Sequence, residues 1–267
     1  MNNFSPNALK TFKECPRKYY FKYIQQISTP QKSTPFEKGK KIHALANYYL
    51  KGEDITKFEK ALNDEEKRIW DLLKSNEYFQ KNYINSEYNL SCKINNYWVG
   101  GRLDALVKDN TDCYYILDYK TGAIPKNPEF DYQTMIYLLA TKAFFKDCKK
   151  LSFVYIDLKN NQNHIIELTD DLVNKYTTEI ETICSTINKT QDFKKNENNC
   201  KFCECKKFCY LSIWQVVSSC FNFFHNSAAT PLPIGSSFIA EVNDETCSLV
   251  KLQENDSFSP FFSLISE

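Results

Sequence analysis

The chain has 267 residues, of which 42% are hydrophobic and 25% charged, the balance of a globular protein with a sizeable buried core. It starts without an apolar run and nowhere holds the roughly 20 consecutive apolar residues that a membrane helix needs. We therefore expect a cytoplasmic protein with no membrane partner. Because that compartment keeps thiols reduced, the eleven cysteines are expected to be metal ligands and buried thiols, not a disulfide framework.

The formal net charge is only +1, but positive charge gathers near the N-terminus. Residues 1–51 hold ten Lys and Arg against two acidic residues, Glu14 and Glu37. A basic face of this kind suits a polyanion such as nucleic acid. The alternative is an ordinary solvated helix surface.

The first part of the chain is expected to be largely helical. Ser5 followed by Pro6 has the pattern of an N-cap and a first helical position, and Pro16 starts a second helical run. Apolar residues recurring on one helix face predict a helix over 36–52 and another over 57–75.

The pattern then changes to that of strands, with two more helices further on. A turn is expected at 109–112 and another at 160–163, and Thr169 is expected to cap a long amphipathic helix. This order of elements predicts a mixed α/β domain. The predicted strands are 83–92, 97–109, 113–121, 151–158 and 164–168, and the helix between the third and fourth covers 128–145.

These elements divide the chain into three regions. We expect a helical N-terminal region over 1–80, a core with a cysteine cluster over 81–209, and a tail over 210–267. The tail differs in composition, since it contains eleven serines and a single basic residue, Lys251. No function is assigned to it.

Two acidic residues and a lysine stand on neighbouring predicted strands. Alternation along a strand puts Asp118 and Lys120 on one face, and hairpin pairing could place Asp104 beside Asp118. Two carboxylates and an ammonium inside an apolar sheet are costly without a task, and a divalent cation such as Mg²⁺ or Mn²⁺ supplies one. Such a site suits phosphodiester hydrolysis, in which the metal activates water and the lysine stabilises charge. The alternative is an Asp/Lys pair on the exposed face of an edge strand.

Six short motifs occur in order between residues 5 and 209: "SPNALKTFKECPRKYYFKYI", "GKKIHAL", "GRLDAL", "ILDYKTG", "QTMIY" and "CKFCECKKFC". Together they resemble the PD-(D/E)XK nuclease superfamily. The resemblance is to its RecB-like exonuclease branch, which includes AddB-type nuclease domains and CRISPR-associated RecB-like exonucleases. It implies a restriction-endonuclease-like core, with a mixed central sheet flanked by helices.

By this resemblance Asp104 and Asp118 bind the metal and Lys120 is the catalytic lysine. His43 is implied as a further metal ligand, and an imidazole ligand tilts the preference toward Mn²⁺. Asp118 stands where many relatives carry Glu. The alternative for His43 is a packed or solvated helix histidine.

The "QTMIY" motif places Gln133 and Tyr137 four residues apart on one helical face. In the family such a pair lies beside the active site; the alternative is an amphipathic helix with a core tyrosine and a solvated glutamine. Glu87 matches an acidic position that precedes the first catalytic strand in some relatives. Arg102 is expected to share a face with Asp104 and either reach phosphate or form a structural ion pair.

The cysteine cluster has two interpretations. The resemblance implies a [4Fe–4S] cluster held by Cys15, Cys200, Cys203 and Cys209, which would clasp the N-terminal helices to the end of the domain. The alternative is a structural zinc site made locally by Cys200, Cys203, Cys205 and Cys209. The remaining thiols are expected to be buried or incidental: Cys92, Cys113, Cys148, Cys184, Cys220 and Cys247.

The resemblance thus predicts a metal-dependent DNA nuclease, an exonuclease preferring single-stranded ends, in DNA repair, recombination or CRISPR-type DNA processing. The basic, aromatic stretch "RKYYFKY" is expected to contact phosphates and bases or simply to pack between helices. The sequence has no G-x₄-G-K-[S/T] motif, so any helicase would be a separate partner, as would CRISPR-adaptation proteins. The alternatives are a non-catalytic DNA-binding or assembly subunit with the same fold, and a nuclease active only within a complex.

Overall fold

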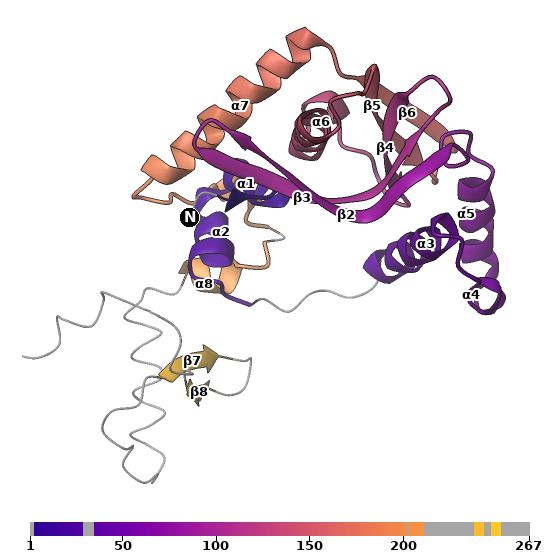
Figure 1. Ribbon diagram of the computed structural model, residues 1–267. Helices are drawn as coiled ribbons and strands as arrows, with labels where there is room; N and C mark the ends of the chain where they lie inside the picture. Colours follow the sequence, from indigo (N-terminus) through magenta and orange to yellow (C-terminus); the bar gives the residue numbers. More distant parts are fainter. Residues whose placement is uncertain (1–2, 29–34, 202, 211–237, 243–246, 252–267) are drawn as a thin grey trace, which may run out of the picture. The chain divides into compact units, whose positions relative to one another are not determined.

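Figure 1 shows the computed structural model of the protein, which describes residues 3–28, 35–201, 203–210, 238–242 and 247–251. The chain divides into two compact units, Met1–Glu204 and Cys205–Glu267, and each is described by itself. Within the second unit, helix α8 covers Lys206–Tyr210, and strands β7 (Phe238–Val242) and β8 (Cys247–Lys251) form an antiparallel pair. The rest of the predicted tail, with Cys220, lies outside the described residues.

The N-terminal region is helical, as predicted. The Ser5 hydroxyl accepts a hydrogen bond from the backbone N–H of Ala8 at 3.2 Å, and Pro6 stands at the first helical position. The elements are α1 (Pro6–Glu14), α2 (Pro16–Tyr19), the π-helical turn η1 (Tyr20–Ile24), α3 (Pro35–Leu50), α4 (Thr56–Lys60) and α5 (Asp64–Lys74).

The single helix predicted over 57–75 is wrong, because the chain breaks between α4 and α5. The side chain of Asn63 accepts from the backbone N–H of Glu66 at 2.9 Å, and the Glu66 carboxylate accepts from the N–H of Asn63 at 3.1 Å. This capping box starts a new helix at Asp64.

One mixed sheet forms the centre of the first unit. Strand β3 pairs with β2 and β4 in antiparallel fashion and with β1 in parallel, β5 runs parallel to β4, and β6 is antiparallel to β5. The mixed α/β architecture predicted from the sequence is confirmed. The strands are β1 (Asn3–Phe4), β2 (Asn82–Ile94), β3 (Tyr97–Lys108), β4 (Cys113–Lys120), β5 (Lys150–Asp157) and β6 (Gln162–Glu167).

Two predicted boundaries move for local reasons. Asp131 accepts from the N–H of Gln133 at 3.0 Å and caps α6, so the helix predicted over 128–145 becomes the 3-10 turn η2 (Pro128–Phe130) followed by α6 (Tyr132–Phe144). The predicted turn at 160–163 is shorter, since Gln162 already pairs with Asp157. Thr169 caps α7 (Asp170–Lys189) as predicted, and a short 3-10 turn η3 (Glu197–Asn199) follows.

Helices cover both faces of the sheet and create two apolar cores. Alternation along β5 sends Phe153 and Tyr155 into one core and Val154 and Ile156 into the other. The first core contains side chains of α1, α6 and α7, and the second contains side chains of α3 and α5. Figure 1 shows α6 and α3 on opposite sides of the sheet. The result is a three-layer arrangement of helices, sheet and helices.

The thiols outside the cluster are varied. Cys92 and Cys184 are buried in the first core, as expected, and Cys113 and Cys148 are half-buried.

Among the helices that the structure describes, none is both long and apolar enough to cross a bilayer.

The split between β3 and β4 positions the candidate site. Starting from the turn, the two strands pair from Lys108–Tyr114 to Ala105–Leu117. Beyond Ala105–Leu117, β4 continues beside β5 alone and β3 runs on toward β1. Side chains near Asp104 and Asp118 therefore lie where the strands part, and no ladder hydrogen bonds fill the opening.

Candidate active site

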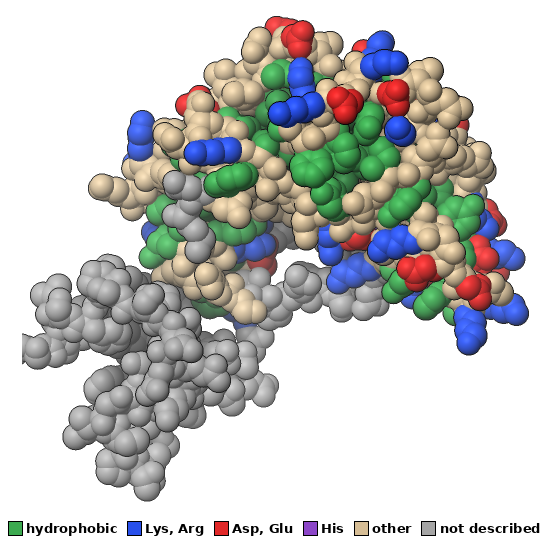
Figure 2. All heavy atoms as spheres, viewed as in Figure 1, with side chains coloured by type: hydrophobic (Ala, Val, Ile, Leu, Met, Phe, Trp, Pro, Cys, Tyr) green, Lys and Arg blue, Asp and Glu red, His purple; other side chains and the backbone are tan. Residues whose placement is uncertain are grey.

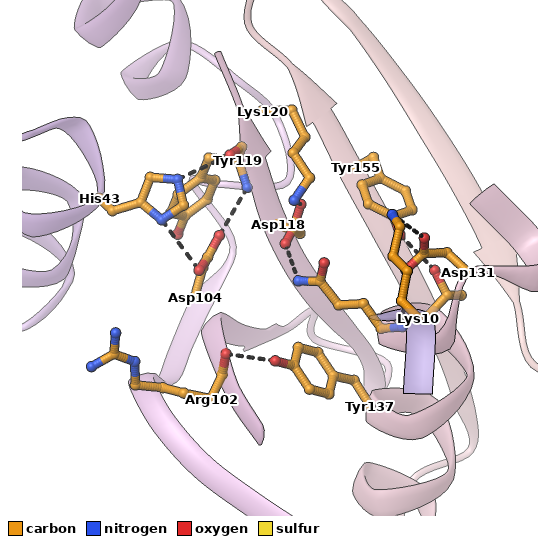
Figure 3. A network of polar contacts seen from close by, with 12 residues as sticks. Lys10, His43, Arg102, Asp104, Asp118, Tyr119, Lys120, Asp131, Tyr137 and Tyr155 are labelled. Carbon is orange, nitrogen blue, oxygen red and sulfur yellow. Dashed lines mark hydrogen bonds and ion pairs between the residues drawn. The ribbon is translucent and has the colours of Figure 1, made fainter. Parts of the chain in front are cut away.

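Strand β4 aims its side chains to alternate faces at this opening. Asp118 and Lys120 point toward α1 and α6, whereas Tyr119 between them packs in the core under α3 (Figure 3). Their placement on one face agrees with the expectation from strand alternation.

Asp118 is buried and held from two directions. Lys120 Nζ lies 2.7 Å from its Oδ2, and the side-chain amide of Gln133 donates to its Oδ1. Burial, together with the charge of Asp104, raises the pKa of Asp118 to about 6, although Lys120 and His43 act in the opposite direction. The structure places Asp118, Lys120 and Gln133 together, and Asp118 is not on an exposed edge.

Asp104 and His43 form a second polar group on the other side of Tyr119. His43 Nδ1 lies 3.2 Å from Asp104 Oδ1, and the backbone N–H of Tyr119 donates to Asp104 Oδ2 at 3.1 Å. The Asp104 carboxylate therefore accepts from a backbone N–H of β4 at a point where β3 no longer pairs with that strand. His43, on α3, is also 3.0 Å from the Tyr119 carbonyl through Nε2. The packed-helix alternative for His43 does not describe these contacts.

Both ring nitrogens of His43 face oxygen atoms, so the imidazolium form satisfies both of them. Burial lowers the pKa of His43, but the hydrogen bond and charge of Asp104 and the Tyr119 carbonyl outweigh it and leave the pKa above its ordinary value.

Glu87 joins this group from strand β2. One ligand atom each of His43, Glu87 and Asp104 lies within 4.8 Å of the other two. Glu87 stands between the pairs Ser86–Ala105 and Tyr88–Leu103, which puts it opposite Asp104, and its φ of 49° marks a local irregularity in the strand. Sequence analysis indicated this residue only weakly, because a glutamate in the left-handed region within a strand leaves no recognisable pattern.

The predicted metal ligands were His43, Asp104 and Asp118, and the arrangement differs in one respect. Among the described residues, the donors that converge are His43, Asp104 and Glu87, while Lys120 and Gln133 occupy the oxygens of Asp118. One imidazole and two carboxylates are intermediate and hard donors, so this set fits Mg²⁺ or Mn²⁺.

The two residues of the "QTMIY" motif do different things. Gln133 contacts Asp118 directly, whereas the hydroxyl of the buried Tyr137 donates to the Arg102 carbonyl at 2.9 Å. A Cβ on Gly101 would lie 2.8 Å from that hydroxyl, so glycine allows Tyr137 to approach β3. Tyr137 thus supports the strand that carries Asp104 and does not reach the carboxylates in this structure.

Arg102 points outward and pairs with Glu87. Its Nε lies 2.9 Å from Glu87 Oε2, and 64% of its side chain is exposed. Of the two expectations for Arg102, the structure shows the ion pair.

The cysteines divide between the two units. Cys15 is buried in the first unit, where its Sγ accepts from the backbone N–H of Asn196 at 3.4 Å. The side chains of Asn196 and Asn199 also donate to the Glu14 carbonyl, at 2.9 and 2.8 Å. Cys200 and Cys203 are half-buried and follow this segment directly, whereas Cys205 and Cys209 belong to the second unit.

The basic N-terminal stretch is partly neutralised. Lys18 and Lys22 each lie 3.3 Å from Glu204, and the ring of Tyr19 is buried and stacks on Tyr23 and Phe193. Helix packing therefore explains Tyr19. On the face shown in Figure 2, basic and acidic side chains of the first unit are interspersed.

Comparisons with known proteins agree with this geometry. A family model described as the PD-(D/E)XK nuclease superfamily matches residues 3–99 and 81–210. The CRISPR-associated exonuclease Cas4 of Francisella tularensis subsp. novicida (strain U112) is 26% identical over 205 residues, covering 76% of this chain and 91% of that protein. A solved structure from Eubacterium rectale, named "Putative exonuclease", shares the fold, with a TM-score of 0.51 and 12% identity over 79% of this chain and 89% of its own.

The family model covers more than half of the chain, and it includes the strands that carry Asp104, Asp118 and Lys120. The mixed sheet between two helical layers, which the resemblance implied, is also present. The chain therefore belongs to the PD-(D/E)XK nuclease superfamily.

Proposed function

We propose that this nuclease is a metal-dependent exonuclease acting on DNA, with a preference for single-stranded ends. The observation that carries the proposal is the buried Asp118 with Lys120 2.7 Å away, beside the group of His43, Glu87 and Asp104. The similarity to a CRISPR-associated exonuclease supports exonuclease action and a role in DNA repair, recombination or CRISPR-type DNA processing. A helicase or CRISPR-adaptation proteins are the partners that such a role implies.

Each side chain has a task in this reaction. His43, Glu87 and Asp104 would hold Mg²⁺ or Mn²⁺, and Asp118 would join them once Lys120 or Gln133 releases one of its oxygens. The bound metal would supply Lewis-acid stabilisation of the phosphate and a more acidic water. Lys120 stabilises the negative charge that grows on the phosphate oxygens. Gln133 fixes the orientation of Asp118, and Tyr137 holds the Arg102 carbonyl so that β3 presents Asp104.

The test uses purified protein with Mn²⁺ or Mg²⁺ and labelled DNA that is linear or circular, and single- or double-stranded. We expect degradation of linear single strands, abolished by EDTA and reduced at least about 1,000-fold by Lys120→Ala, because that lysine acts on the transition state. Lys159→Ala, an exposed lysine in the turn before β6, is the matched control. Unchanged degradation with EDTA or Lys120→Ala contradicts the proposal, and DNA binding without cleavage favours a non-catalytic subunit.

We also propose that the cysteines Cys15, Cys200, Cys203 and Cys209 hold a [4Fe–4S] cluster. The burial of Cys15 and its N–H···S contact from Asn196 support it, since thiolates that bind such clusters commonly accept backbone hydrogen bonds. The structural role would be that of a clasp on the N-terminal helices. A zinc site of Cys200, Cys203, Cys205 and Cys209 is the alternative, to be separated by metal content.

A further inference from the structure

A hollow of about 400 Å³ lies beside the catalytic lysine. Its wall is built from the first half of α1, the chain just after β4 and the start of α6, and Lys120 lines it. It is thus continuous with the site of hydrolysis.

The polar lining of this hollow consists mostly of hydrogen-bond donors. Lys10, Lys120, Asn7 and Gln133 bring two ammonium groups and two side-chain amides to it. Asp131 is the one carboxylate in the lining, and both its oxygens are engaged: Oδ1 accepts from the N–H of Gln133 at 3.0 Å, and Oδ2 lies 3.3 Å from Lys10 Nζ. The lining therefore carries a net positive charge.

The rest of the lining is apolar and comes from Pro6, Ala123, Ile124 and Pro125. Ammonium groups next to an apolar wall are the combination that a nucleotide needs, because its phosphate and its base make opposite demands.

We propose that this hollow binds the nucleotide next to the scissile phosphodiester, and that Lys10 Nζ binds the phosphate of that nucleotide. The inference rests on the proposed nuclease function and adds a substrate subsite to it. Lys10 is half exposed, and in the free protein Asp131 holds it at the edge of the hollow (Figure 3). An arriving phosphate takes the place of Asp131 Oδ2 as the partner of Lys10 Nζ, while Asp131 Oδ1 continues to cap α6.

Helix α1 offers a matched control in Lys13. It stands one turn after Lys10 and pairs with a carboxylate of another helix in the same way, 2.8 Å from Glu179. It lines a separate hollow with residues of α7, away from Lys120. Loss of either lysine removes one exposed charge and one ion pair from α1, so only the subsite distinguishes the two variants.

The experiment measures single-strand cleavage by the wild type, Lys10→Ala, Lys10→Arg and Lys13→Ala. We expect Lys10→Ala to raise KM about 10-fold with little change in kcat, as one charge-assisted hydrogen bond to bound substrate is lost. Lys10→Arg retains most of the affinity, and Lys13→Ala matches the wild type. The salt dependence of binding becomes shallower by about 0.7 in its logarithmic slope for Lys10→Ala alone.

Oligonucleotides with one neutral methylphosphonate on either side of the cleaved bond then locate the contact. At one of the two positions, the neutral linkage weakens the wild type and removes the difference between wild type and Lys10→Ala. A 10-fold effect that persists on both oligonucleotides overturns the subsite, as does a fall in kcat alone, which would make Lys10 a support for Asp131 and Gln133. Cleavage by the wild type with Lys10→Ala equal to Lys13→Ala rejects the subsite alone, and absence of cleavage by the wild type rejects the proposed function.

Discussion

At the scale of single residues, protons and a divalent cation compete in this site for the carboxylate oxygens and the imidazole nitrogens. His43 meets an oxygen at each ring nitrogen, and Asp118 is buried against Lys120. The raised pKa values of His43 and Asp118 both follow from this arrangement. Without a metal, Lys120 and the imidazolium of His43 offset the negative charge of Asp118 and Asp104. A bound divalent cation would take over part of that role.

Glu87 gives the first prediction. If its carboxylate helps to hold the cation, Glu87→Gln raises the Mn²⁺ concentration needed for half-maximal cleavage by about 10-fold, because one of the charges that attract the ion is lost. The rate at saturating Mn²⁺ should change much less. A metal titration of the initial cleavage rate measures both quantities.

The control for this variant is Glu77→Gln, which removes an exposed carboxylate outside the site. A second explanation for an effect of Glu87→Gln is loss of the ion pair with Arg102. Arg102→Ala tests it, because this variant breaks the pair and leaves the Glu87 carboxylate in place. An unchanged metal titration for Glu87→Gln, or an equal shift for Glu77→Gln, contradicts a role for Glu87 at the metal.

How far the sequence could predict these residues follows from the kind of contact each one makes. Asp118 and Lys120 share a face by simple alternation, so their proximity was predictable. The contacts of Asp104 and His43 with the Tyr119 backbone were not, because they depend on where β3 parts from β4. Glu87 enters through a positive φ, which the order of residues does not reveal for a glutamate.

At the scale of elements, α5 supports the helix that carries His43. Ile69, Trp70 and Leu73 of α5 are buried in the core under α3. The carboxylate of Glu66 completes the capping box of α5 and also lies 2.8 Å from Lys41, which is two residues before His43 on α3. The first turn of α5 therefore contacts α3 two residues from His43 and helps to hold that helix in place.

The Asn63 cap can be tested by a change far from the chemistry. We expect Asn63→Ala to lower the free energy of unfolding by about 1 kcal/mol, because the N–H of Glu66 loses its acceptor. Asn63→Ser keeps an acceptor and should change it by a few tenths of a kcal/mol. Urea unfolding of the three proteins followed by circular dichroism gives the comparison, and equal midpoints for Ala and Ser would show that the cap contributes nothing.

Element boundaries show the limit of periodic patterns. The apolar spacing over 57–75 continues through the break at Ala61–Asn63, so periodicity alone merged two helices. The same occurred at Asp131, whose side chain starts α6 inside a segment predicted to be continuous helix. In both places a short side chain accepting a backbone N–H decides the boundary, and reading cap residues before periodicity would have found it.

At the scale of the whole molecule, chain segments far apart in sequence meet at the end of α1. The N–H of Arg17 donates to the Lys194 carbonyl at 3.1 Å, and Asn196 and Asn199 bind the carbonyl of Glu14. Cys15 lies between these contacts. Closing so long a loop is costly in chain entropy, which makes a covalent or metal link at this point most effective.

Replacement of single cysteines separates the two metal assignments. If the cluster proposal holds, anaerobically purified wild type contains iron and sulfide and absorbs near 400 nm (order of magnitude for thiolate–iron charge transfer). Cys15→Ser then loses iron and Cys205→Ser retains it; a zinc site predicts the reverse, with stoichiometric zinc lost on Cys205→Ser and kept on Cys15→Ser. Cys148→Ser, a half-buried thiol outside the cluster, serves as the control. Limited proteolysis adds a readout that does not depend on activity. Loss of the clasp should expose α1 and α2 to protease in Cys15→Ser alone. Resistance of Cys15→Ser equal to that of the wild type would contradict the clasp.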